Sequence, residues 1–138
     1  MMIRYEEKDW DGNIPYEMSD GTSLLDEMVG KDDFGDSTCI MAVTDSDEVA
    51  GIIVFNETPD TCLVRTLCVG YAYRGQGIGR HLLEMVMSDN DEIVLSSLDE
   101  SVGFYEKLGF RVTERFDGTA SMVNNKCQRT LMEVSYEL

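Results

Sequence analysis

The sequence predicts a mixed α/β fold, and two observations predict it. The first is a series of β-rich runs, TCIMAVTD at 38–45, EVAGIIVFNE at 48–57 and CLVRTLCV at 62–69. The second is a glycine-rich turn that leads into the amphipathic stretch RHLLEMVM at 80–87 and then into the β-rich run EIVLSSL at 92–98. A strand, a helix and a second strand in this order are typical of a crossover between parallel strands.

The N-terminal third adds three weaker elements. Residues 2–7 are expected to form a short edge strand, and residues 9–21 a loop, because Gly, Asn and Pro interrupt them. SLLDEMV at 23–29 carries apolar residues at helical spacing, with Gly30 as its stop.

The second half completes the element order. Ser46-Asp47 is expected to turn a hairpin between the first two long β runs. ESVGFYEKL at 100–108 predicts a short helix that Gly109 ends, and FRVTERF at 110–116 and RTLMEVSYEL at 129–138 predict two final strands. No repeat, low-complexity tract or linker divides residues 1–138, so one domain is expected.

The chain is strongly acidic, with 27 Asp and Glu against 11 Lys and Arg and a net charge of −16. This balance argues against nucleic acid as a partner, since binding along a nucleic-acid backbone releases counterions only where the protein surface is basic. It is compatible with a cationic substrate, although solubility, including solubility in a salty cytoplasm, is the simpler explanation. No apolar run approaches the ~18 residues of a membrane span. MMIRYEEKDW at the start lacks the apolar core of a secretory signal, so a cytoplasmic protein is expected.

The four cysteines predict no metal site. Cys39, Cys62 and Cys68 lie inside apolar runs, and Cys127 has no paired cysteine near it. His81 is the only histidine, so ligands for zinc are scarce. The cysteines are therefore expected to act as small hydrophobic residues.

The glycine-rich turn at 74–79 has the composition of a phosphate-binding loop, because exposed N–H groups and a helix N-terminus favour anions. It is not a P-loop, since no Lys-Ser or Lys-Thr follows its glycines. It is not a dinucleotide fingerprint either: Arg80 stands where the third glycine is needed, and Gly79 falls one residue early.

The turn resembles the [QR]-x-x-G-x-[GA] motif of the GCN5-related N-acetyltransferases, with Arg74, Gly77 and Gly79 at its fixed positions. Leu67 and Val69 match the apolar positions upstream, and GFYEKLGF at 103–110 is similar to the second signature of the family. The resemblance covers roughly residues 38–138. It implies the family fold: a mixed, mostly antiparallel sheet whose two central parallel strands, 62–69 and 92–98, splay apart and are flanked by helices.

The resemblance also implies acetyl-CoA as the acetyl donor, bound where the parallel strands separate. The pyrophosphate is expected on the loop N–H groups, with added charge from its two arginines; the segment comprises Arg74, Gly75, Gln76, Gly77, Ile78, Gly79 and Arg80. The pantetheine arm is expected to pair with the main chain of Leu67, Cys68 and Val69.

In this family an amine attacks the thioester directly, and a tyrosine in the second signature protonates the departing thiolate. Tyr105 matches that tyrosine. The alternative role for Tyr105 is a hydrogen bond to the sulfur without proton transfer. Phe104 and Phe110 beside it are expected in the core.

The sequence departs from the family at the general base, because Leu63 occupies the position where many relatives carry glutamate. Glu57, Asp60, Tyr71 or a water chain are candidate replacements; His81 is expected to be a helix-face residue. Arg65 lies on the same strand face as Leu63. The resemblance implies that Arg65 binds a substrate carboxylate; the alternative is a salt bridge at the surface or on the CoA side. A second departure is Leu98, which replaces an asparagine that often contacts CoA.

Three functions stay open at this level. An acetyltransferase acting on the primary amine of a small molecule or amino acid is favoured by Tyr105, whereas a non-catalytic acyl-CoA-binding module is favoured by Leu63. A peptide or protein N-terminal acetyltransferase is the third. The acceptor is expected to contact the variable stretches 8–36 and 117–128, where the aromatic residues line a pocket or simply pack; they are Trp10, Tyr16 and Phe34. Homodimers are common in the family, and this sequence does not decide the point.

Overall fold

The computed structural model describes residues 2–12 and 34–125. The helix predicted at 23–29 and the strand predicted at 129–138 lie outside the described residues, as do Tyr16 and Cys127.

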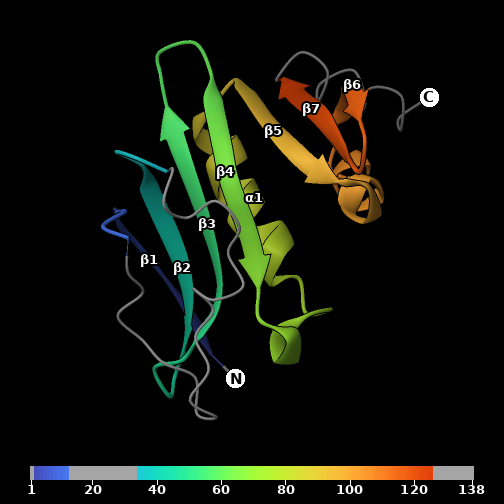
Figure 1. Cartoon of the computed structure of the whole chain (residues 1–138). Coiled ribbons are helices and arrows are strands. Elements are labelled where there is room, and N and C mark those ends of the chain that lie inside the picture. The colour runs from blue at the N-terminus through green and yellow to red at the C-terminus, as the bar shows by residue number, and fades with distance from the viewer. Residues whose placement is uncertain (1, 13–33, 126–138) are drawn as a thin grey trace, which may run out of the picture. The chain divides into compact units, whose positions relative to one another are not determined.

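The chain divides into two compact units (Figure 1). Unit 1 comprises Met1–Asn56 and Arg65–Val86, and unit 2 comprises Glu57–Val64 and Met87–Leu138. The seven strands of the described residues form one mixed sheet in the order β1-β2-β3-β4-β5-β7-β6. This is the α/β fold class that the sequence predicts.

Unit 1 begins with three antiparallel strands, β1 (Ile3–Asp9), β2 (Thr38–Thr44) and β3 (Val49–Glu57). The β2–β3 hairpin turns where predicted, but its loop is longer than the Ser46-Asp47 pair. The Thr44 N–H donates to Glu48 O over 2.9 Å, and Asp47 has a φ of 61°. A three-residue loop whose last residue is left-handed is a common hairpin connection, and aspartate tolerates this conformation.

The helix α1 (Ile78–Asp89) covers one face of these strands, and it passes behind β4 in Figure 1. The cross-strand row Tyr5–Ala42–Gly51 runs beneath it. A Cβ atom on Gly51 would lie 3.1 Å from Ile78 Cγ2 and 3.4 Å from Leu82 Cδ1, while the Tyr5 and His81 rings are 4.4 Å apart. Small residues at the middle of the row therefore let the helix approach the sheet closely.

The opposite face of the same strands carries an apolar cluster. Its members alternate with the helix-facing residues, as a pleated strand requires; they are Trp10, Phe34, Cys39, Met41, Val43, Val49, Ile52 and Val54. The rings of Trp10 and Phe34 are 5.9 Å apart, and both side chains are buried. These two aromatic residues thus pack in a core.

Unit 2 contains the start of β4 (Cys62–Val69), which runs parallel to β5 (Glu92–Leu98) through the pairs Cys62–Ile93 and Leu63–Val94. Both strands have the predicted bounds. The splaying of the two strands beyond these pairs involves both units and stays a prediction. A short helix, α2 (Val102–Glu106), precedes the last two described strands.

The structure adds one strand that was not predicted from the sequence. Residues 119–125, expected within a variable substrate-contacting stretch, form β7 (Thr119–Asn125), which pairs antiparallel with both β5 and β6 (Arg111–Phe116). The missed signal is Asp117-Gly118, a hairpin dipeptide whose glycine has a φ of 83°. TASMVNN is weakly β-forming, and its two neighbouring strands stabilise it instead.

Candidate functional site

The glycine-rich loop lies in unit 1, between the end of β4 and the start of α1. Gly75 and Gly77 have φ values of 78° and 83°, a region that L side chains rarely adopt. A Cβ atom on either residue would meet nothing within 4 Å among the described residues. The glycines are therefore needed for backbone conformation, and the space above their main chain is open to a ligand.

The first turn of α1 presents its N–H groups at this loop. The first helical hydrogen bond runs from His81 N–H to Gly77 O, at 3.0 Å. The N–H groups from Gly77 to Arg80 consequently have no partner inside the helix. The first turn contains no acidic residue, although the chain is rich in them. An anion at this position meets donors and the positive end of the helix dipole.

Three hydrogen bonds fix the approach to the loop. Gly70 N–H donates to Ala50 O at 2.8 Å, and Tyr73 N–H donates to Gly70 O at 2.8 Å. The Tyr73 hydroxyl donates to Glu48 Oε2 at 2.5 Å, and this bond is the main cause that raises the pKa of Tyr73 to about 12. Tyr73 was not predicted as a site residue, and its only signal in the sequence is its place directly before Arg74-Gly75.

The two loop arginines have different partners. Arg74 Nε donates to Val69 O at 3.0 Å, and the Arg74 guanidinium carbon lies 5.6 Å from the centre of the Tyr71 ring. Arg80 Nε pairs with Glu84 Oε1 at 2.7 Å, one helical turn along α1. The structure thus joins Arg74 to the end of β4, whereas Arg80 is held along the helix. Gln76 is exposed, Ile78 is buried and Gly79 is half-buried.

The strand residues predicted to hold the pantetheine arm are half-buried on β4: Leu67, Cys68 and Val69. Cys68 packs against the apolar cluster, and Val69 O already accepts the hydrogen bond from Arg74. Burial raises the pKa of the Cys39 thiol to about 11 and that of Cys62 to about 12. These two cysteines are therefore inert core residues, as predicted.

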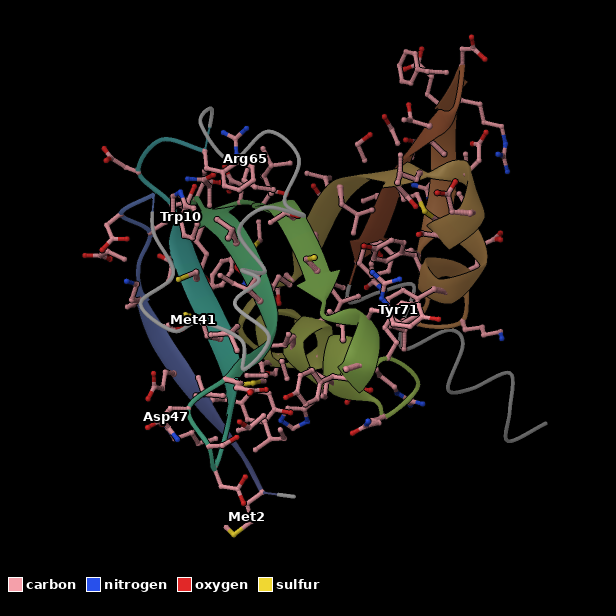
Figure 2. The ribbon with its side chains drawn as sticks, turned by 60° about the horizontal axis from the view of Figure 1, so that its bottom comes forward. Met2, Trp10, Met41, Asp47, Arg65 and Tyr71 are labelled. Carbon is pink, nitrogen blue, oxygen red and sulfur yellow. The ribbon has the colours of Figure 1, made fainter. Side chains whose placement is uncertain are left out.

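Arg65 lies at the other end of the unit 1 part of β4, and Figure 2 shows it at the same end of the strands as Trp10, with Tyr71 beyond the opposite end. Arg65 Nε donates to Asn56 Oδ1 at 2.7 Å. Asn56 Nδ2 in turn donates to Asp36 O at 2.7 Å, and the buried Ser37 Oγ lies 3.0 Å from Asn56 Oδ1. A neutral amide therefore orients this exposed guanidinium along one edge.

Tyr105 lies in unit 2, on α2, and is 8% exposed. Its ring meets Phe104 and Phe110 edge-on, at 5.1 and 5.6 Å between centres. Burial raises the pKa of Tyr105 to about 12, so the phenol keeps its proton throughout the neutral range. Phe110 is buried as predicted, whereas Phe104 is 39% exposed, because it lies on the outer side of a helix of only five residues.

The candidate bases lie on different elements of the chain. Glu57 accepts a hydrogen bond from Asn90 Nδ2 at 2.9 Å, just past the end of α1. Asp60 is exposed in the turn before β4, and Tyr71 is 83% exposed. His81 is an exposed residue on α1 that packs on Tyr5, as predicted. Leu63 is half-buried on β4, and Leu98 is 55% exposed at the end of β5.

Neither a metal site nor a membrane-spanning helix occurs in the part of the chain that the structure describes. No group of three or more His, Cys, Asp or Glu side chains there is arranged to hold a metal ion. Within the same residues, none of the helices is long and apolar enough to cross a membrane.

The sequence and the structure were compared with known proteins. The sequence profile of the acetyltransferase (GNAT) domain matches residues 35–112, more than half of the chain. Among curated protein sequences, none matches. Among solved structures, an acetyltransferase from Exiguobacterium sp. 255-15 is similar at 20% identity, over 94% of this chain and 97% of that one, with a TM-score of 0.67.

Two further solved structures are similar. The PaiA N-acetyltransferase of Thermoplasma acidophilum, in complex with coenzyme A, has 24% identity over 74% of this chain and 69% of that one, with a TM-score of 0.57. The ribosomal-protein-S18-alanine N-acetyltransferase of Escherichia coli has 19% identity over 64% and 68%, with a TM-score of 0.57. At these identities the likeness concerns the fold.

Proposed function

The chain belongs to the GNAT acetyltransferase family, and we propose that it transfers the acetyl group of acetyl-CoA to the primary amine of a small molecule or amino acid. The observation that carries the proposal is the glycine loop. Its left-handed glycines, Gly75 and Gly77, leave open space above the main chain, and the first turn of α1 adds N–H donors without an acidic side chain. These features fit a diphosphate group.

Arg74 is the loop residue suited to add charge to that site. Its side chain rests on Val69 O, which the pantetheine arm is proposed to use. When the arm takes Val69 O, the guanidinium is released toward the diphosphate, where a charge-assisted bond is stronger than one to a neutral carbonyl. Arg80 is already paired with Glu84, so it contributes less.

The proposed reaction is direct. The neutral amine attacks the thioester carbonyl carbon and the C–S bond breaks. The nitrogen then releases one proton, to solvent or to a base, as the amide forms, and the leaving thiolate receives one proton. We assign that proton, or a hydrogen bond to the sulfur, to Tyr105 on the strength of the second motif, GFYEKLGF. A phenol with a pKa of about 12 stays protonated at neutral pH, so it can donate a hydrogen bond to the sulfur. Complete transfer to a thiolate with a pKa near 8.5 is uphill by roughly 5 kcal/mol in the free protein.

Binding and catalysis are tested separately. Calorimetric titration with CoA is expected to show binding that Gly77→Ala weakens by about tenfold, since the alanine is strained at a φ of 83°. Gly103→Ala is the control, because Gly103 lies in α2 with nothing within 4 Å of its added Cβ. Absence of CoA binding by the wild-type chain would refute the proposal.

Catalysis is measured as release of free thiol from acetyl-CoA with a panel of amines. Turnover on any amine, reduced about 100-fold or more in Tyr105→Phe, is expected for a donor at the leaving group. The rival function, a non-catalytic acyl-CoA-binding module, is favoured by Leu63 at the usual base position. That rival predicts CoA binding without turnover on any amine.

Arg65 is proposed to bind a carboxylate on the acceptor. Asn56 holds its Nε edge, which leaves the two Nη groups as a fork, the geometry that suits a carboxylate. Arg65→Gln is expected to raise KM for an amino acid by about 10- to 100-fold and to leave KM for its decarboxylated amine nearly unchanged. Arg111→Gln, on the exposed start of β6, is the charge-matched control. An equal effect on both acceptors would refute this role.

A further inference from the structure

Asn124 is a fully buried polar residue in the middle of unit 2. Its side chain is 0% exposed, on a strand whose neighbouring residues Met122 and Val123 are apolar and also buried. Its Nδ2 donates to Leu108 O at 3.0 Å. Burying an amide in such surroundings costs free energy unless the amide is hydrogen-bonded, so the partner of Asn124 matters.

The Leu108 carbonyl belongs to the turn that ends α2. In that turn Leu108 N–H and Phe110 N–H both donate to Tyr105 O, at 3.0 and 3.1 Å. Gly109 between them has a φ of 95°, the left-handed conformation that commonly terminates a helix. Asn124 therefore bonds to the same turn that caps the carbonyl of Tyr105.

The helix that carries Tyr105 needs such support. It contains only five residues, Val102–Glu106, so its own hydrogen bonds fix its direction poorly. The main chain of β7 pairs with β5 on one side and β6 on the other. Because the main-chain groups of β7 pair with these two strands, a side chain has to make the bond from β7 to the turn. Asn124 makes this bond.

We infer that Asn124 is a positioning residue for Tyr105: by holding the Leu108 carbonyl, it sets the direction in which α2 presents the phenol. The inference rests on the proposed function, because it assigns a purpose to the orientation of Tyr105. The hydrogen bonds and the burial that support it all lie within unit 2.

The test compares Asn124→Ala with Met122→Ala. Met122 is 1% exposed and lies two residues earlier on the same face of β7, so its truncation disturbs the core and keeps the amide bond. In the folded protein, Asn124→Ala is expected to lower kcat between about 10-fold and 100-fold while KM for acetyl-CoA changes less than about twofold. Met122→Ala is expected to keep kcat. Equal kcat values for the two variants would overturn the inference.

A second readout does not depend on turnover. The phenols are titrated by ultraviolet absorbance above pH 9, with Tyr105→Phe identifying the signal of Tyr105. Loosening of α2 admits water to the phenol, so Asn124→Ala is expected to shift this titration toward pH 10, whereas Met122→Ala leaves it in place. An unshifted titration in Asn124→Ala would overturn the inference. Asn124→Val, which has no donor and suits a strand, replaces the alanine variant with the same expected outcomes if that variant does not fold.

The two readouts separate this inference from the proposed function. If the wild-type chain turns over no amine, the proposed activity fails, and the titration still decides whether Asn124 holds Tyr105. If the wild-type chain is active and neither kcat nor the titration responds to Asn124→Ala, only the inference fails.

Discussion

Tyr105 and Tyr73 have similarly raised pKa values for different reasons. Burial is the cause for Tyr105, whereas Tyr73 is raised mainly by its hydrogen bond to Glu48. A buried phenol keeps its proton, which fits the donor role proposed for Tyr105. A phenol bonded to a carboxylate fastens one loop to another, here the β2–β3 turn to the segment before the glycine loop. The motif identified Tyr105, but Tyr73 required a contact between residues 25 positions apart.

The raised pKa of Tyr105 predicts a loss of stability in alkali. The folded chain holds the phenol proton more tightly than the unfolded chain, with a pKa of about 12 against 10.0. This stabilisation is complete below pH 10 and is lost as the pH rises through about 12, and its size is roughly 2–3 kcal/mol.

Urea denaturation at pH 9 and pH 11.5 measures this loss. Tyr105→Phe, which has no proton to lose, is expected to lose less stability between the two pH values than the wild-type chain. Parallel losses in both proteins would contradict the assignment, because the remaining tyrosines titrate alike in each.

Among the helices and strands, the close packing of α1 on β3 has the clearest consequence for the proposed site. Gly51 allows this contact because it has no side chain, and its backbone conformation is an ordinary one. In the sequence, the only sign of the close packing is a glycine inside a β-rich run. An added Cβ would lie 3.1 Å from Ile78 Cγ2 and 3.2 Å from the main-chain Cys68 O. Ile78 is the first residue of α1, so this crowding would displace the helix start that forms the proposed diphosphate site.

Gly51→Ala is therefore expected to destabilise the chain by about 1–3 kcal/mol and to weaken CoA binding as well. Gly103→Ala, in open space on α2, is expected to stabilise it by up to about 1 kcal/mol, because alanine favours a helix. Thermal unfolding and CoA titration of both variants measure these effects. Wild-type stability in Gly51→Ala would show that α1 is not closely packed on β3.

At the scale of the whole molecule, the net charge of −16 opposes a polyanionic donor. The proposed site attracts the diphosphate with N–H groups and Arg74 at short range, whereas the repulsion comes from charges spread over the surface. Salt screens the long-range repulsion first, since the Debye length falls from about 30 Å at 0.01 M to about 10 Å at 0.1 M.

KM for acetyl-CoA is therefore expected to fall several-fold as ionic strength rises from 0.01 to about 0.15 M. KM for S-acetylpantetheine, which carries no phosphate, is the control and is expected to stay constant. A KM for acetyl-CoA that rises steadily with salt would show that local positive charge dominates instead.

Features that depend on residues close together in the chain could be predicted from the sequence. The β-rich runs placed β2 to β5 within a residue or two, and the glycine spacing together with its flanking residues and GFYEKLGF indicated the family. Only the tertiary structure decided the features that depend on distant residues: β7 between β5 and β6, Gly51 beneath α1, the bond from Asn124 to Leu108, and the hold of Asn56 on Arg65. The physical reason is that a turn or a strand run is favoured by its own residues. The contacts of a buried amide such as Asn124, or of a glycine such as Gly51, are made with atoms that only the folded chain brings together.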